Sequence, residues 1–192
     1  LKETIVSRRT SRRKRPNEFV ELTIESLGFE GVAIARHEGI VHFVKQAVPG
    51  DVILAEVFTK KSSYAEAKIK EIITPSPLRV TPVCSHFGVC GGCSWQNLPM
   101  SEQLLWKKQH VVDSFERIGK VPIGELTDTL ASPRTLHYRN KMEFSFGASR
   151  WLTDVEMNMD EDESHKNFAL GLHIPGRFDK VLDVMNCYIA HE

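Results

Sequence analysis

Three of the four cysteines in this 192-residue chain fall in one stretch, Cys84-Ser85-His86-Phe87-Gly88-Val89-Cys90-Gly91-Gly92-Cys93. Their spacing is C-x5-C-x2-C, and the intervening glycines allow the backbone to turn tightly with the sulfur atoms pointing inward. The fourth cysteine, Cys187, lies far along the sequence. A site made of all four thiols would bring residue 187 back to this loop. We therefore interpret the stretch as a ligand loop that organises the second half of the chain.

Three kinds of site could use these thiols: an iron–sulfur cluster, a structural zinc ion or a pair of disulfides. Disulfides are least favoured, because the Arg-rich start of the sequence contains no apolar signal stretch and cytoplasmic thiols stay reduced. Four-cysteine zinc sites usually combine two C-x2-C pairs, whereas only Cys90 and Cys93 form such a pair here. Three clustered thiolates and a remote fourth favour a cluster over zinc or buried thiols without a ligand. His86 stands as an alternative ligand.

The charges are unevenly distributed although the formal net charge is zero. Residues 1–15 carry one acidic residue and seven basic ones: Lys2, Arg8, Arg9, Arg12, Arg13, Lys14 and Arg15. We expect residues 1–16 to be a disordered arm that suits a phosphate backbone, with a solvated tail as the alternative. An acidic stretch lies within 153–166, where we expect a long hairpin loop. No apolar run is long enough to cross a membrane, so we expect a cytoplasmic protein, and a monomer.

Residues 17–75 have the pattern of a small β-barrel. Five short β-rich segments, separated by Gly-containing turns, lie at 19–25, 32–36, 40–44, 52–58 and 64–73. Such a succession predicts a barrel of the oligonucleotide-binding type.

The second domain is expected over 76–192. Residues 101–118 predict a helix capped by Ser101 and ended by Gly119. Its apolar stripe is expected to be core: Leu104, Leu105, Val111, Val112, Phe115 and Ile118. Off this stripe we expect solvated side chains: Trp106, Lys107, Lys108 and His110. An antiparallel sheet is expected over about 126–185, with a strand at 136–147 paired to 168–174 and 180–184. The fold class is therefore mainly β with one long helix (α+β).

Several of these motifs resemble one known family. Phe29-Glu30-Gly31-Val32-Ala33 and Val48-Pro49-Gly50-Asp51 look like the signature of the TRAM domain, and Tyr138-Arg139-Asn140-Lys141 is similar to a basic strand. Together with C-x5-C-x2-C and the remote cysteine, they resemble the RNA uracil-5 methyltransferases, especially those acting on bacterial 23S rRNA.

The resemblance implies a four-iron four-sulfur cluster held by Cys84, Cys90, Cys93 and Cys187, with a structural role. It implies that the partner is RNA. Ribosomal RNA is favoured over transfer RNA, because the transfer RNA uracil-54 enzymes of many bacteria lack the barrel and the cluster. It also implies a doubly wound domain that binds S-adenosylmethionine. The sequence contains no G-x-G turn and all four cysteines are assigned to the cluster. We therefore expect an N-terminal part of the enzyme, with the catalytic residues outside this chain.

Five residues are candidate RNA contacts. Arg139 and Lys141 would bind phosphate beside Tyr138, and Phe29 and Phe43 would stack unpaired bases, with packing in the barrel core as the alternative for each phenylalanine. Two further classes of protein stay open. One is a free-standing RNA-binding adaptor with a zinc site, and the other is a redox protein whose cluster carries electrons.

Overall fold

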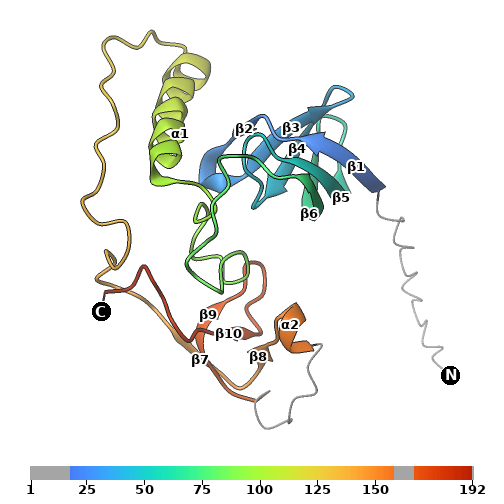
Figure 1. Ribbon diagram of the computed structural model, residues 1–192, viewed down its shortest axis with the longest axis vertical. Coiled ribbons are helices and arrows are strands. Elements are labelled where there is room, and N and C mark those ends of the chain that lie inside the picture. Colours follow the sequence, from blue (N-terminus) through green and yellow to red (C-terminus); the bar gives the residue numbers. More distant parts are fainter. Residues whose placement is uncertain (1–17, 158–166, 192) are drawn as a thin grey trace, which may run out of the picture.

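The computed structural model describes residues 18–157 and 167–191. A β-barrel and a smaller four-stranded sheet lie at opposite ends of it; helix α1 lies beside the barrel, and the segment with the cysteine loop lies between the barrel and the second sheet (Figure 1). The arm expected over 1–16 and residues 158–166 of the acidic stretch fall outside the described residues. Among the residues that are described, no helix has the length and apolar character of a membrane span.

Six strands build the barrel in the order β1-β5-β6-β4-β3-β2. Their bounds are β1 Glu18–Thr23, β2 Ser26–Leu27, β3 Ala33–His37, β4 Ile40–Lys45, β5 Val52–Lys60 and β6 Tyr64–Thr74. β1 pairs with β5, while its continuation β2 pairs with β3, and Glu25 donates a backbone hydrogen bond to Ile34 (2.9 Å). The first strand therefore touches both edges of the sheet and closes the barrel. The five predicted strands are confirmed, and only the two-residue β2 was not predicted.

The barrel core is narrow because small side chains point into it from paired strands. Five buried alanines lie on the barrel strands: Ala33, Ala35, Ala55, Ala65 and Ala67. Larger apolar side chains fill the space around them: Leu22, Ile24, Leu27, Val44, Ile53 and Val57. Inward and outward residues alternate along most of these strands, with an exception in β5, where Ala55, Glu56 and Val57 are all buried. This alternation fixes the strand register, because a shift by one residue would turn the inward side chains to solvent.

Helix α1 (Met100–Asp113) continues as a π-helical turn, η2 (Ser114–Gly119). The extent agrees with the prediction, and Gly119 does end the helix, but the residue before its first turn is Pro99, not Ser101. The predicted core stripe is wrong. Leu105 is 58% exposed and Ile118 is 75% exposed, and no residue of α1 is fully buried.

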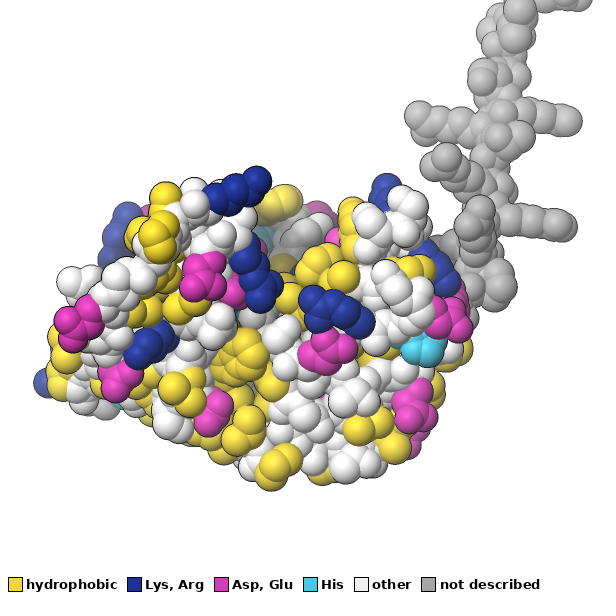
Figure 2. All heavy atoms as spheres, turned by 90° about the horizontal axis from the view of Figure 1, so that it is seen from above, with side chains coloured by type: hydrophobic (Ala, Val, Ile, Leu, Met, Phe, Trp, Pro, Cys, Tyr) yellow, Lys and Arg dark blue, Asp and Glu magenta, His cyan; other side chains and the backbone are white. Residues whose placement is uncertain are grey.

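The opposite face of α1 makes the packing contacts. Trp106 packs against the barrel core, and the His110 Nε2 atom lies 2.9 Å from the Leu27 carbonyl oxygen. The helix meets the barrel on this side only, so its apolar stripe stays at the surface. Hydrophobic side chains are also visible among the charged ones on the face shown in Figure 2.

The second sheet has the order β7-β9-β10-β8. Its strands are β7 Ser145–Gly147, β8 Arg150–Trp151, β9 Ala169–His173 and β10 Val181–Asp183. β9 and β10 confirm two predicted strands, but the β10–β8 pair is parallel, so the purely antiparallel prediction is wrong. Between β8 and β9 the acidic stretch opens with a short helix, α2 (Asp154–Met157), instead of a loop.

The strand predicted over 136–147 forms only in its last part, as β7. Arg139 instead pairs with the segment around Ala190: its N–H donates to Ile189 O (2.9 Å), and its carbonyl accepts from His191 N (2.8 Å). The backbone groups of Arg139 are therefore paired close to Cys187 in sequence, and residues 138–144 do not extend the sheet.

Candidate metal centre and nucleic-acid interface

The four cysteine thiols share one neighbourhood. Burial raises the pKa of the Cys90 thiol, and the nearby thiols of Cys93, Cys84 and Cys187 raise it further. Burial likewise raises the pKa of Cys93, with Cys84 and Cys187 adding to the effect. None of the four forms a disulfide. The structure therefore places Cys187 near the loop that holds the other three thiols; a shared site stays a prediction.

The spacing of these thiols bears on what they could hold. Among the described residues, no three His, Cys, Asp or Glu side chains form a group that could hold a metal ion. His86 Nδ1 lies 3.9 Å from Cys84 Sγ, at the edge of the same site.

The cysteine loop contacts both the barrel and the segment that follows the second-sheet strand β9. On the barrel side, Gln46 Nε2 donates to the Gly88 carbonyl (2.6 Å). On the other side, Gly91 lies against the ring of Pro175 and has a left-handed backbone (φ 69°). A side chain at Gly91 would overlap that ring as well as strain the backbone. The loop conformation therefore depends on both halves of the molecule.

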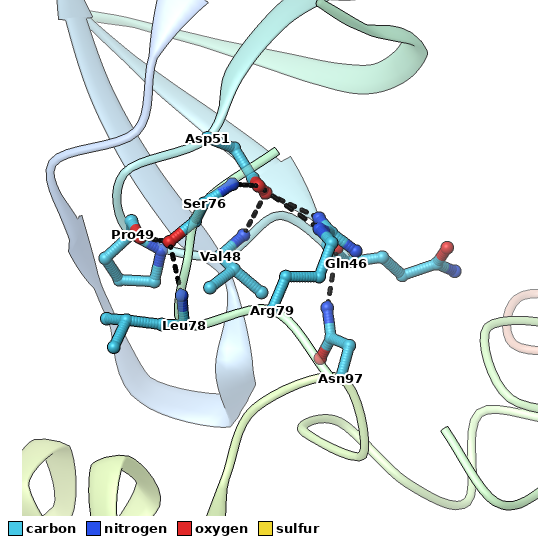
Figure 3. A network of polar contacts seen from close by, with 8 residues as sticks. All are labelled: Gln46, Val48, Pro49, Asp51, Ser76, Leu78, Arg79 and Asn97. Atoms are coloured by element: carbon cyan, nitrogen blue, oxygen red, sulfur yellow. Dashed lines mark hydrogen bonds and ion pairs between the residues drawn. The ribbon is translucent and has the colours of Figure 1, made fainter. Parts of the chain in front are cut away.

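A buried carboxylate fixes the barrel to the linker that leads to Cys84 (Figure 3). Asp51 has no exposed side-chain surface. It accepts hydrogen bonds from the N–H groups of Val48 (2.7 Å) and Ser76 (2.9 Å), and it forms a two-point ion pair with Arg79 (2.5 and 3.1 Å). This gives the last residue of Val48-Pro49-Gly50-Asp51 a structural role.

The network also reaches the segment that follows the cysteine loop. Arg79 and Asn97 both donate to the carbonyl oxygen of Gln46, at 3.2 and 2.9 Å. Ser76 Oγ donates to the carbonyl of Pro49 (2.6 Å). The residues before and after the cysteine loop are thus held against the same corner of the barrel.

The two predicted stacking residues lie outside the barrel core, so the core alternative is wrong for both. Phe29 is 57% exposed, and the centroid of its ring lies 4.8 Å from the centroid of the His110 ring on α1. Next to it, Gly31 adopts a left-handed backbone (φ 80°) under Trp95, where any side chain would collide with the indole. Phe43 is half-buried on the outer face of β4, where its ring contacts that of Tyr64 edge-on at 5.9 Å.

The three basic-segment residues lie next to the cysteine loop. Arg139 and Lys141 line a hollow of about 480 Å³ whose opposite wall includes Cys90, Gly91 and Gly92. Lys141 pairs with Glu143 at 2.8 Å, and both side chains are exposed. Tyr138, also exposed, lines a larger cavity of about 670 Å³ that Cys93 borders as well.

Two features of these sites were missed from the sequence. The hollow depends on the pairing of Arg139 with the Ala190 segment, and the Phe43–Tyr64 contact depends on the parallel pairing of β4 with β6. Alternation along each strand does indicate which residues point outward, but no local pattern shows which strands become neighbours.

Comparison with known proteins identifies relatives of this chain. A TRAM domain model matches residues 13–70, which overlaps the expected barrel. A protein from Bacteroides thetaiotaomicron named as an RNA methyltransferase is 47% identical over 163 residues, which cover 85% of this chain and 36% of that protein. The chain therefore carries a TRAM domain and is related to the RNA methyltransferases over most of its length. A second relative, from Porphyromonas gingivalis, is 44% identical, and the match covers 88% of this chain and 37% of that protein.

The chain thus spans a little over a third of the length of these two relatives. A solved structure also resembles it, that of Pyrococcus abyssi tRNA (uracil-54, C5)-methyltransferase in complex with S-adenosyl-L-homocysteine. The TM-score is 0.50 at 22% sequence identity, covering 90% of this chain and 33% of the other. At this identity the likeness shows a common fold.

Proposed function

We propose that these residues are the RNA-binding part of an S-adenosylmethionine-dependent RNA (uracil-5-)-methyltransferase that acts on 23S rRNA. The observation that carries the proposal is the 47% identity, over 85% of the chain, to a protein described as an uncharacterized RNA methyltransferase. S-adenosylmethionine and the catalytic groups would belong to the part of the family members that this chain does not match. A transfer RNA substrate is the alternative that the Pyrococcus neighbour favours. Methylation of 23S rRNA and tRNA transcripts by the full-length protein would separate the two substrates.

A [4Fe–4S] cluster held by Cys84, Cys90, Cys93 and Cys187 is part of the same proposal. Its support is the shared neighbourhood of the four thiols and their C-x5-C-x2-C and remote spacing. When bound, the cluster supplies four iron–thiolate bonds that tie the loop to the far segment. Methyl transfer to C5 of uracil requires no electrons, so a structural role suffices.

Metal analysis tests this part directly. We expect protein purified without oxygen to contain about four irons and as much sulfide per chain, with broad sulfur-to-iron absorption in the visible spectrum. One zinc ion per chain and no colour would contradict the cluster and would favour the zinc-stabilised adaptor. A cluster with reversible electron transfer and no affinity for RNA would favour the redox protein.

The hollow beside the cysteine loop is the proposed phosphate contact. We expect Arg139→Gln combined with Lys141→Gln to weaken RNA binding and to lower the slope of log K against log salt by about 1.4, since each lost phosphate contact on a single strand removes about 0.7. Binding isotherms at several salt concentrations measure this slope. Arg117→Gln with Lys120→Gln removes the same charge at the end of η2, outside the hollow, as a matched control. An unchanged slope in the first variant would contradict the contact.

A further inference from the structure

The outer face of the barrel carries an aromatic pair that the hollow does not include. Along β4, His42 and Val44 point into the barrel, so Phe43 and Lys45 point outward. Parallel pairing with β6 places Tyr64 opposite Val41 on the same outer face, and the rings of Phe43 and Tyr64 lie 5.9 Å apart. Both residues are half-buried, so part of each side chain reaches solvent.

Cations follow the aromatic pair along the same strands. Lys45 is the next outward residue after Phe43 on β4, whereas on β6 Glu66, which is aligned with Phe43, lies between Tyr64 and Lys68. The register aligns Lys45 on β4 with Lys68 on β6, then Glu56 on β5 and Phe19 on β1, in one row across the sheet. Lys68 pairs with the nearly buried Glu56 at 3.0 Å, yet its own side chain is 62% exposed. No ion-pair partner for Lys45 is found in the described part of the chain. The row ends at Phe19, which is 52% exposed.

The sequence adds positive charge at the Phe19 end of this row. Phe19 is the second residue of β1, and the seven basic residues of 1–15 precede that strand directly in the chain. The described surface seen in Figure 2 mixes both signs of charge with apolar side chains. In the sequence, the row therefore ends next to the most basic stretch of the chain.

This combination selects one class of ligand. Aromatic rings offer flat faces to bases, and lysines beside them offer charge to phosphates, which together suit an unpaired strand. A duplex keeps its bases stacked inside and cannot use the rings. We propose that Phe43 and Tyr64 stack bases of single-stranded RNA whose backbone passes Lys45 and Lys68 towards Phe19. The inference rests on the proposed function, because it names a second RNA-contact surface of the same protein.

Fluorescence anisotropy with the 192-residue chain and a labelled oligouridylate of about 12 nucleotides tests the inference. We expect Phe43→Leu and Tyr64→Leu each to weaken binding about tenfold, with the salt slope unchanged and affinity for an RNA duplex unaltered. Lys45→Gln should instead lower the slope by about 0.7. Tyr64→Phe keeps the ring, and Phe146→Leu removes an exposed aromatic from the second sheet; both should bind like the unaltered chain.

The outcomes separate this surface from the hollow. If both leucine variants, checked for native circular dichroism, bind as tightly as the unaltered chain while the Arg139 and Lys141 variant binds weakly, the inference is overturned and the proposed function stands. If both leucine variants lose duplex binding equally, stacking of unpaired bases is wrong. If the unaltered chain binds no RNA at any salt concentration, the proposed function fails and the inference with it.

Discussion

Replacing Asp51 with alanine is expected to lower the free energy of unfolding by about 3–5 kcal/mol. The side chain is fully buried and pairs with Arg79, which is itself only 22% exposed. Removing it leaves a guanidinium in a poorly solvated place and strips the Val48 and Ser76 N–H groups of their acceptor. Breaking a buried ion pair from one side is costly for this reason. Chemical denaturation of the variant measures the loss.

Two comparisons make the Asp51 prediction specific. Glu71→Ala removes an exposed carboxylate from β6 and should change the free energy of unfolding by less than about 0.5 kcal/mol. Asp51→Asn keeps the shape and one acceptor oxygen but loses the charge, so it should fall between the two. A fully stable Asp51→Ala protein would show that the network in Figure 3 does not hold the linker to the barrel.

Acid should weaken the same network. Burial alone would raise the pKa of Asp51, but hydrogen bonds from Arg79, Ser76 and Val48 outweigh burial and lower it below its ordinary value. The carboxylate therefore contributes stability above the pKa of the unfolded chain, about 3.9, and that contribution is lost as the pH falls through the lower folded-state pKa. The stability of Asp51→Asn should accordingly depend less on pH in this acidic range than that of the unaltered chain.

The local sequence pattern predicted the barrel strands well, because they are short, alternate inward and outward residues for much of their length, and are separated by glycine-containing turns. The helix shows the limit of the same reasoning. Its apolar stripe is real, but periodicity says only that the stripe is apolar, not which neighbour covers it. In the structure, α1 packs against the barrel through Trp106 and His110. The helical periodicity of the sequence places both residues among the solvated ones. An amphipathic side chain such as tryptophan or histidine can pack on either kind of face.

Long-range pairing limited the prediction of the second domain. The segment around Arg139 alternates like a strand, yet its hydrogen bonds go to Ile189 and His191, far away in sequence. The thiols could nevertheless be grouped in advance, because cysteines are few and their chemistry requires common ligands. Gly91 is the glycine of the loop where a side chain would meet its neighbours most closely. The neighbour that excludes a side chain there is Pro175, in the other half of the domain, which the local sequence does not reveal.

Cys187→Ser is the second change expected to have a large effect. A ligand set that joins the loop at 84–93 to residue 187 closes a circuit of about a hundred residues. The chain-entropy model assigns about 4–5 kcal/mol to a covalent closure of this length, and a four-thiolate cluster acts as a comparable clip. Losing one thiolate should therefore lower bound iron per chain and destabilise the second sheet by up to that amount.

Hydrogen exchange locates the Cys187 effect within the molecule. We expect faster exchange in β9 and β10, and in the Arg139 backbone groups paired beside Cys187, while β5 and β6 of the barrel keep their protection, because Asp51 and its partners hold the barrel independently of the thiols. Met185→Ala, which truncates an exposed side chain in the same segment, should leave iron and exchange unchanged. His86→Ala tests the alternative ligand. Full iron in Cys187→Ser together with loss of iron in His86→Ala would transfer the fourth ligand from the remote cysteine to the loop histidine.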